Sequence, residues 1–410
     1  MKWLYRCPSC GSEYGIEAGR YLCDPCSASN KPGAPLKGVL ECAWEGERPG
    51  GISWENSLPA SFSVRDVPLP VSAEFFPPLP VGDTPLWAPE RLRVELGFPG
   101  LFLKDDTCEP SGSFKDRASF LVAAFALSRG IGEIALASTG NAASSMAAVG
   151  AAAGLKVTVF LPATAPVAKR IQVLQYGAEL REVAGNYDRA FDLSLDYSEE
   201  TGTLSRNTAY NPLTIEGKKT VSFEIAEALA RSSLDARRRF RAPDHVFVPT
   251  GDGVILAGVY RGFEDLMKLG AISKMPTVWA AQAEGSKAIA RALTAAASGY
   301  YGDPFDPVVP SSTVADSISV DAPRNGPYAL AKLLKYDGKA VTVNDEEILA
   351  AQRLVASRAG LFAEPSSACA FAGFLKVKEG IDPSETVVVM LTGSGLKDIK
   401  SAARAVGAAV

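Results

Sequence analysis

Three short apolar runs in this 410-residue chain each end in a glycine-containing turn, and this pattern constrains the fold more than any other feature. Residues 132–137 lead into Ser138-Thr139-Gly140-Asn141, and 246–249 lead into Thr250-Gly251-Asp252-Gly253. Residues 386–391 lead into Thr392-Gly393-Ser394-Gly395. The first two turns open helical patterns, and short β runs alternate with helical patterns from about residue 81 onward. This alternation predicts a parallel α/β architecture, with ligands bound at the carboxyl ends of the strands.

The composition is that of a globular protein with a large core, with 47% hydrophobic and 21% charged residues. Its length suggests two or three domains. Lysine and arginine number 42 and aspartate and glutamate 46, a net charge of −4. A chain of this kind has no global basic field, so we expect it to bind neither nucleic acid nor an anionic membrane.

A single histidine, His245, limits the available chemistry. It opens an apolar run that reads as a buried strand, and no nucleophile-base pattern surrounds it. We therefore expect a structural histidine, which excludes serine and cysteine triads and histidine-rich metal centres. Acid-base chemistry falls to a lysine, a carboxylate, a cofactor or a metal.

Four of the seven cysteines form two CxxC pairs separated by twelve residues: Cys7, Cys10, Cys23 and Cys26. Two such knuckles supply four thiolates to one ion, so the pattern predicts a structural zinc ribbon over residues 1–34. Two redox CxxC motifs are the alternative, but neither pair lies between a strand and a helix. Zinc ribbons often bind nucleic acid, but the positive and negative charges of this one cancel, so we do not expect it to do so.

The segments that flank the ribbon indicate how the chain is organised. Residues 35–80 are rich in proline and glycine and predict an extended connector, and 81–410 form the remaining unit. The N-terminus lacks the apolar region of a secretory signal, and no apolar stretch reaches the roughly 20 residues that span a bilayer. We expect a cytoplasmic protein with reduced cysteines.

Two polar side chains and one glycine-containing turn have open interpretations. Lys115 follows a glycine-containing loop and opens a long helix, where the helix dipole favours the neutral amine that a Schiff base requires; a solvated lysine paired with Asp116 is the alternative. Asn141 either caps a helix or points its amide at a ligand. The glycines at 251 and 253 suit a phosphate, although GxG alone is weak and no P-loop or GxGxxG follows a strand.

Taken together, four motifs resemble the threonine synthases, which belong to the tryptophan-synthase-β-like, fold-type-II class of pyridoxal-phosphate enzymes. The motifs are SGSFKDR (Ser111 to Arg117), STGN (Ser138 to Asn141), TGDG (Thr250 to Gly253) and TGSGLKD (Thr392 to Asp398). The resemblance implies two open α/β lobes with the cofactor between them, the smaller over roughly 129–211, plus the N-terminal zinc ribbon. It also implies a homodimer.

The resemblance assigns roles to residues of this chain. Lys115 would hold the cofactor covalently and move protons, and Asn141 would bond the cofactor's 3′ oxygen. Thr392 would offer its hydroxyl to the pyridine nitrogen, which makes the ring a milder electron sink and favours elimination and replacement over transamination. The cofactor phosphate would be bound by backbone N–H groups of Gly251, Asp252, Gly253, Val254 and Ile255.

The implied reaction takes O-phospho-L-homoserine and water to L-threonine and phosphate. Candidates for the substrate carboxylate are Ser138, Thr139 and Ser144, and candidates for its phosphate are Lys104, Asn207, Thr208 and Lys218. Ala142, Thr214 and Ser394 depart from residues common in relatives. The alternatives are a cysteate synthase, a threonine dehydratase or a catalytically silent relative that uses its ribbon for interactions.

Overall fold

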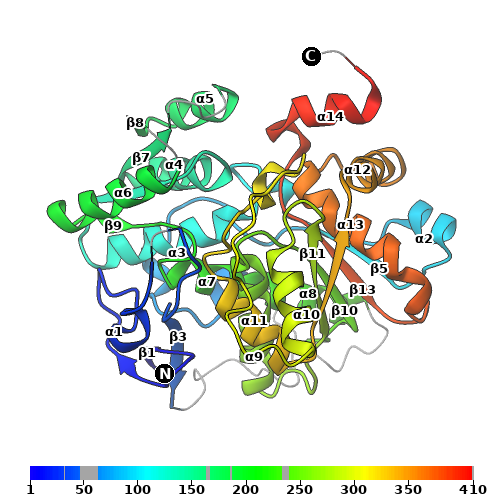
Figure 1. Cartoon of the computed structure of the whole chain (residues 1–410), viewed down its shortest axis with the longest axis horizontal. Coiled ribbons are helices and arrows are strands. Elements are labelled where there is room, and N and C mark those ends of the chain that lie inside the picture. The colour runs from blue at the N-terminus through cyan, green and yellow to red at the C-terminus, as the bar shows by residue number, and fades with distance from the viewer. Residues whose placement is uncertain (32, 47–62, 163–166, 185–186, 233–239, 409–410) are drawn as a thin grey trace.

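The computed structural model of the chain describes residues 1–31, 33–46, 63–162, 167–184, 187–232 and 240–408 (Figure 1). These residues form three sheets, of six, four and three strands. The two larger sheets belong to separate α/β lobes, and the smallest belongs to the N-terminal segment (Figure 1). The predicted α/β class is therefore confirmed.

The larger lobe is built on a sheet with the strand order β12-β11-β10-β13-β5-β4. Its strands are parallel except for the antiparallel edge strand β4. Both faces of a parallel sheet are covered, so its strands are apolar on both sides. The strands are β4 (Leu86–Trp87), β5 (Leu101–Asp105), β10 (His245–Pro249), β11 (Thr277–Ala283), β12 (Lys339–Val343) and β13 (Val387–Leu391).

Two layers of helices cover this sheet. Val246 and Val248 of β10 pack on one layer, and Phe247 packs on the other, as alternation along a strand requires. The first layer comprises α8 (Thr220–Ser232), α9 (Val254–Lys268), α10 (Ala288–Ala297) and α11 (Gly326–Lys335). The second comprises α2 (Glu90–Leu96), α12 (Asp345–Ala359) and α13 (Pro365–Val377). The short helix α14 (Ile399–Val406) ends the described chain.

The smaller lobe has a parallel sheet in the order β8-β7-β6-β9. Helix α3 (Lys115–Ser128) shares a core with this sheet and with α4, while its first residue faces the space between the lobes. The other elements are β6 (Glu133–Ala137), α4 (Asn141–Ala153), β7 (Lys156–Pro162), α5 (Val167–Gln175), β8 (Glu179–Val183), α6 (Tyr187–Thr201), β9 (Leu204–Ser205) and α7 (Leu213–Glu216). All four strands fall within the predicted 129–211.

The N-terminal sheet differs from the prediction. It joins β1 (Lys2–Arg6) to β2 (Glu13–Tyr14) and to β3 (Glu41–Glu45), with α1 (Asp24–Ser27) beside it. Strand β3 lies in the predicted connector, so the ribbon's sheet continues past residue 34; its Cys42, Ala43 and Trp44 are buried. Residues 47–62 of the predicted connector lie outside the described residues.

The ribbon is docked on the rest of the molecule. The Tyr21 ring lies 5.0 Å from the Tyr210 ring, and the Tyr21 hydroxyl accepts a hydrogen bond from the Ser205 N–H at 3.0 Å. The Trp44 indole donates to Asp265 of α9 at 3.1 Å. The ribbon therefore packs against both lobes.

His245 has the structural role that its sequence context predicts. Its ring contacts the Trp279 indole Nε1 at 3.2 Å and Glu385 at 3.1 Å, and it lies outside the cavity described below. Among the described residues, no helix is long and apolar enough to cross a membrane.

Glu264 joins α9 to α11. Its carboxylate accepts hydrogen bonds from Lys332 at 2.8 Å, from the Tyr336 hydroxyl at 2.8 Å and from Arg261 at 3.0 Å. Burial alone would raise the pKa of the Glu264 carboxyl, but Lys332 and Arg261 outweigh it and lower that pKa to about 2. The folded state therefore stabilises the charged form of this carboxyl more than the unfolded state does.

We expect Glu264→Gln to remove a pH-dependent part of the stability. A carboxyl whose folded pKa is depressed stabilises the fold fully above the unfolded value, near 4.5, and loses this effect as the pH falls toward 2. The shift corresponds to on the order of 3 kcal/mol at neutral pH. Denaturant unfolding of both proteins between pH 7 and pH 3 measures it, with Glu346→Gln on the exposed surface of α12 as control. Parallel stability curves at all pH values would contradict the prediction.

Candidate active site

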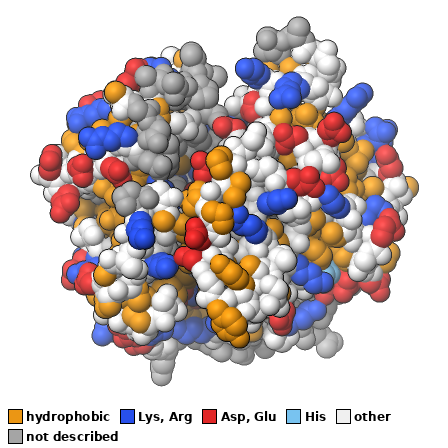
Figure 2. All heavy atoms as spheres, viewed as in Figure 1, with side chains coloured by type: hydrophobic (Ala, Val, Ile, Leu, Met, Phe, Trp, Pro, Cys, Tyr) orange, Lys and Arg blue, Asp and Glu red, His pale blue; other side chains and the backbone are white. Residues whose placement is uncertain are grey.

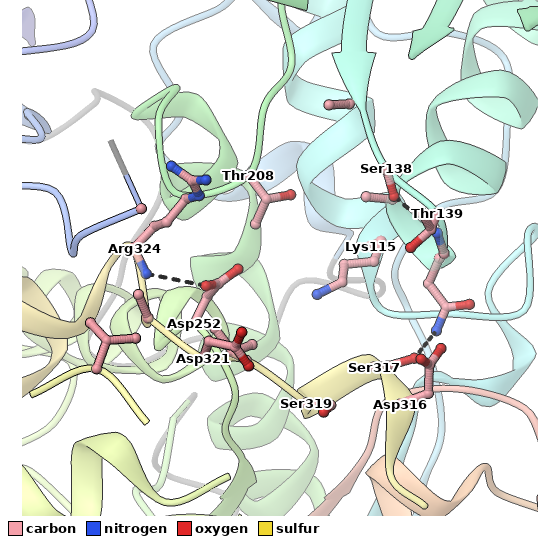
Figure 3. A pocket seen from close by; sticks show the side chains of 18 residues that line it. Lys115, Ser138, Thr139, Thr208, Asp252, Asp316, Ser317, Ser319, Asp321 and Arg324 are labelled. Atoms are coloured by element: carbon pink, nitrogen blue, oxygen red, sulfur yellow. Dashed lines mark hydrogen bonds between the residues drawn. The ribbon is translucent and has the colours of Figure 1, made fainter. Parts of the chain in front are cut away.

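A cavity of about 570 Å³ lies between the two lobes. Residues from the two lobes and from the N-terminal segment line it, and the carboxyl ends of β6 and β10 meet there, as the turn pattern predicts. Figure 3 shows Lys115 between the Ser138-Thr139 turn and Asp252. The lining residues are Gly33, Lys115, Ala137, Ser138, Thr139, Gly140, Asn141, Ala142, Thr208, Asp252, Val308, Asp316, Ser317, Ser319, Val320, Asp321, Ala322 and Arg324.

Lys115 opens α3 and presents its amine to the cavity (Figure 3). Its pKa lies below the ordinary value, first because burial disfavours the charged form and then because Arg206 adds positive charge; Asp252 and Glu364 oppose the shift. The alternative pairing with Asp116 is wrong. The Asp116 carboxylate accepts hydrogen bonds from the N–H and the hydroxyl of Ser111, at 2.7 and 2.5 Å.

Asn141 is the first residue of α4, and its side chain does not cap the helix, because Gly140 occupies the N-cap position. The capping alternative is therefore wrong. The Asn141 Nδ2 group donates to the two oxygens of Glu364, at 3.1 and 3.2 Å, and to the Ser317 hydroxyl at 3.3 Å. Its Oδ1 atom is buried and has no hydrogen-bond partner among the residues that the structure describes. A buried amide oxygen of this kind is costly unless a ligand or water satisfies it.

The turn at 250–253 ends β10 and starts α9. Gly253 has a φ of +85°, a left-handed conformation that favours glycine, and Val254 begins the helix. The Asp252 carboxylate lines the cavity and accepts the Arg324 N–H at 3.2 Å. Burial raises the pKa of Asp252, while Arg324 lowers it in part. The first N–H groups of α9 have no partner within the helix and suit an anion.

Thr392 lies beside the loop that precedes Lys115. Its carbonyl accepts the Phe114 N–H at 2.9 Å, and its hydroxyl lies 3.2 Å from the Ser367 hydroxyl. Thr392 is buried and does not itself line the cavity. A side chain at the next residue, Gly393, would displace the Glu364 carboxylate, because a Cβ there would lie 2.6 Å from a Glu364 oxygen.

The predicted substrate residues separate into two groups. Ser138, Thr139 and Thr208 line the cavity. Lys104 does not, because its amine is bound in a buried ion pair with Glu224 at 2.6 Å. Asn207 is also buried elsewhere, where it accepts the Ala137 N–H at 2.7 Å and supports β6.

The other two candidates lie close behind the cavity. The Ser144 hydroxyl accepts a hydrogen bond from Lys397 at 3.0 Å. The Lys218 amine is buried and donates to the Thr214 carbonyl at 2.7 Å. Its pKa is lowered well below the ordinary value by burial, and then by the positive charges of Lys115 and Arg206.

The sequence interpretation missed Glu364, which orients the Asn141 amide, and Arg324, which lines the cavity. Glu364 precedes Pro365 at the start of α13, and Pro at a helix start was the one local signal available. Nothing local in the sequence connects it to Asn141, which is 223 residues away.

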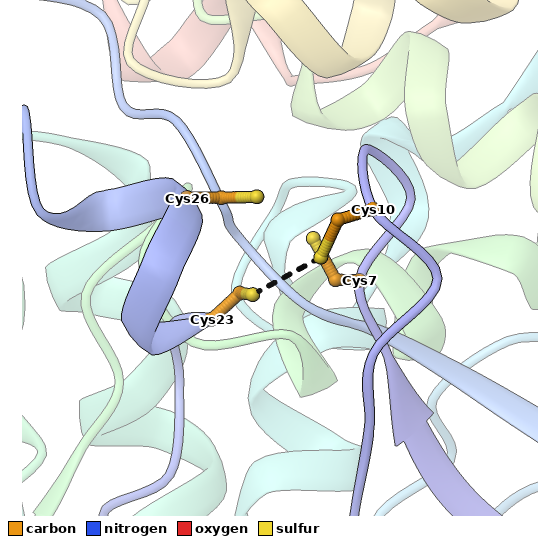
Figure 4. Close-up of side chains that lie close together, drawn as sticks. All are labelled: Cys7, Cys10, Cys23 and Cys26. Atoms are coloured by element: carbon orange, nitrogen blue, oxygen red, sulfur yellow. Dashed lines mark hydrogen bonds between the residues drawn. The ribbon is translucent and has the colours of Figure 1, made fainter.

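The four cysteines of the ribbon do meet at one point. Their sulfur atoms lie within 4.8 Å of one another, and the Cys10 and Cys23 sulfurs are 3.5 Å apart (Figure 4). Cys7 and Cys23 are buried, and Cys10 is exposed. Four converging thiols form a donor set that suits one tetrahedral zinc ion.

On the face of the molecule shown in Figure 2, basic and acidic side chains are interspersed and form no large patch of one charge. This distribution agrees with the near-zero charge balance of the chain.

Comparisons with known proteins agree on the family. Residues 78–393 match the profile described as "Pyridoxal-phosphate dependent enzyme". A threonine synthase of Methanocaldococcus jannaschii is 33% identical, over 98% of this chain and 95% of that protein. A threonine synthase of Halalkalibacterium halodurans is 36% identical, over 78% of this chain and 84% of that protein.

A similar fold occurs in the solved crystal structure of a T.th. threonine deaminase. It superposes with a TM-score of 0.63 and 26% identity, and covers 76% of this chain and 92% of that one. The processed threonine deaminase isoform 2 of Solanum lycopersicum superposes with a TM-score of 0.65 at 23% identity, and covers 79% of this chain and 87% of that one.

We expect the Lys115 amine to react with a small aldehyde at a lower pH than an exposed lysine does. Only the neutral amine attacks an aldehyde, and the lowered pKa of Lys115 increases the neutral fraction at a given pH. The test treats protein freed of bound small molecules with formaldehyde and borohydride between pH 6 and pH 10. Mass spectrometry then compares the labelling of Lys115 with that of the exposed Lys400. Equal pH midpoints for the two residues would contradict the prediction.

Proposed function

Because the chain belongs to the threonine synthases, a family of pyridoxal-phosphate-dependent enzymes, we propose that it converts O-phospho-L-homoserine and water to L-threonine and phosphate. The observation that carries this function is the convergence of Lys115, Asn141 and the Asp252 turn on one cavity between the lobes. These are the residues that the family resemblance assigns to the cofactor.

Pyridoxal phosphate fits this cavity. The volume of about 570 Å³ lies within the range of roughly 300–1,000 Å³ that small-molecule sites occupy. The buried Asn141 amide has an unsatisfied oxygen and shares its N–H groups between Glu364 and Ser317. A ligand group that donates a hydrogen bond would satisfy this oxygen. Following the family resemblance, we assign the cofactor's 3′ oxygen to the Asn141 Nδ2 group, which would donate to it, and its phosphate to the N–H groups of residues 251–255.

When bound, pyridoxal phosphate supplies an electron sink for the negative charge that develops on the substrate's carbon skeleton. The chain supplies the proton transfers and the positioning. Lys115 removes and returns protons, since burial and then Arg206 lower its pKa and so favour the neutral amine. The family resemblance assigns the Thr392 hydroxyl to the ring nitrogen, and a hydroxyl rather than a carboxylate at that position would favour elimination and replacement over transamination.

Ser138 and Thr139 are the residues that we assign to the substrate carboxylate. Both line the cavity directly before α4, whose N-terminus carries partial positive charge. The Ser138 hydroxyl accepts the Gly140 N–H at 3.1 Å, which orients this turn. Ser144 contacts Lys397 behind the turn and supports it from within α4.

We assign one structural zinc ion to Cys7, Cys10, Cys23 and Cys26. Support comes from the convergence of the four sulfur atoms and from the small size of the ribbon, which stabilises itself poorly without a metal. We also propose the cytoplasmic location and the homodimer that the family resemblance implies.

Purified enzyme with pyridoxal phosphate should release phosphate from O-phospho-L-homoserine and form L-threonine. Lys115→Ala should abolish this turnover, because no other residue that lines the cavity in the described chain offers an amine. A coupled phosphate assay and amino-acid analysis measure both products. A colourless protein that does not bind the cofactor would contradict the proposal.

Two further substrates separate the alternatives. A cysteate synthase would release phosphate from O-phospho-L-serine with sulfite, and a threonine dehydratase would release ammonia from L-threonine. Either activity in place of phosphate release from O-phospho-L-homoserine would favour that alternative.

We expect Cys23→Ser to release zinc and to lower the melting temperature more than it lowers turnover. Cys23 is buried among the other three sulfur atoms, and a four-thiolate site loses its geometry without it. Elemental analysis and thermal unfolding measure the two effects, with Cys108→Ser, outside the cluster, as control. Undiminished zinc content would contradict the four-cysteine assignment.

A further inference from the structure

The cavity holds two basic side chains that line it in the described part of the chain, Lys115 and Arg324. Lys115 is assigned to the cofactor. A substrate that carries a phosphate group needs a cation of its own, because a buried dianion is costly without one. The proposed function therefore points to Arg324.

Three parts of the protein hold Arg324 in place. Its N–H donates to the Asp252 carboxylate at 3.2 Å, which ties it to the turn before α9. Its carbonyl accepts the N–H of Leu36, a residue of the ribbon segment, at 2.8 Å. Its guanidinium carbon lies 4.1 Å from the centre of the Phe191 ring on α6 of the smaller lobe. A guanidinium that is fixed in this way loses little entropy when it binds an anion.

Thr208 lies on the same side of the cavity as Arg324 and Asp252 (Figure 3). Its hydroxyl accepts a hydrogen bond from Arg206 Nη1 at 2.5 Å, so the hydroxyl proton is directed away from Arg206. The buried Arg206 also lowers the pKa of both Lys115 and Lys218 through like-charge repulsion. The guanidinium of Arg206 thus lies at Thr208, while Asp252 opposes its effect on both lysines.

The residue at 214 cannot take this role. The Thr214 hydroxyl donates to the Asn211 carbonyl at 2.7 Å. It is fully buried, outside the cavity lining. Arg324 belongs to a different segment, which follows η5 (Asp316–Ile318) and directly precedes α11.

We propose that Arg324, with the Thr208 hydroxyl, binds the phosphate group of the substrate and so determines its specificity for a phosphorylated amino acid. This inference rests on the proposed function. The guanidinium fork matches two phosphate oxygens, as a lysine ammonium does not. The cofactor also carries a phosphate monoester, so the experiment must separate the two sources.

The test compares Arg324→Gln and Arg324→Lys with the wild type, all loaded with pyridoxal phosphate. Arg324→Gln should raise KM for O-phospho-L-homoserine about 10- to 100-fold, the loss expected for a charge-assisted hydrogen-bonded pair, with a smaller change in kcat. Arg324→Lys should recover part of this loss. Arg353→Gln, on the exposed face of α12, removes the same charge outside the cavity and should change nothing.

Equilibrium binding distinguishes phosphate recognition from a purely structural role of Arg324, because only phosphate recognition weakens the binding of phosphate-containing ligands selectively. Titrations followed by the absorbance of the bound cofactor should show weaker binding of inorganic phosphate and of O-phospho-L-homoserine to Arg324→Gln. The affinity for L-threonine, which has no phosphate group, should stay within about twofold. Equal losses for all three ligands would overturn the proposal, because they would indicate a general disturbance of the site.

Reconstitution with pyridoxal phosphate separates the two phosphate sources. A weakened affinity for the cofactor, with KM and phosphate binding unchanged, would assign Arg324 to the cofactor and overturn the proposal. If the wild type fails to use O-phospho-L-homoserine, the proposed function fails, and the phosphate titration still decides whether Arg324 binds a phosphate.

Discussion

The buried guanidinium of Arg117 holds together the elements that carry the active site. It lies on α3, two residues after Lys115, and pairs with Asp106 at 2.6 Å and with both oxygens of Glu224 on α8. Lys104 on β5 joins the same Glu224 at 2.6 Å. A buried charge is tolerated only when it is paired, so these contacts fix the register between α3, β5 and α8. The position of Lys115 in the cavity follows from that register.

Each remaining part of the site is tied to a segment far away in the sequence. The Phe114 N–H binds Thr392, Asn141 binds Glu364, and Asp252 binds the Arg324 backbone. The carboxyl ends of parallel strands bring these turns together, and the cross-connections then set the direction of each side chain. Such bonds hold polar groups in position before any ligand arrives, which lowers the entropy cost of binding.

Local patterns in the sequence predicted the α/β class, the start of α3 at Lys115 and the turns at 138–141 and 250–253, because a strand, a glycine turn and a helix are encoded by neighbouring residues. Lys104 was assigned wrongly because its partner Glu224 is 120 residues away. Strand β3 is hidden in the sequence for a similar reason: it is short, and both CxxC pairs lie between it and its partner β1. Pairings of this kind are set by tertiary packing, which local propensity does not encode.

The ribbon belongs to the catalytic unit in physical terms. Gly33 lines the cavity, the Leu36 N–H supports the carbonyl of Arg324, and Tyr21 and Trp44 pack on the smaller and the larger lobe. A separate interaction module would present these groups to solvent or to a partner. Here they are used within the chain, so the segment that holds the four-cysteine cluster also forms part of one wall of the cavity. The small N-terminal sheet is thereby coupled to the residue that we assign to substrate recognition.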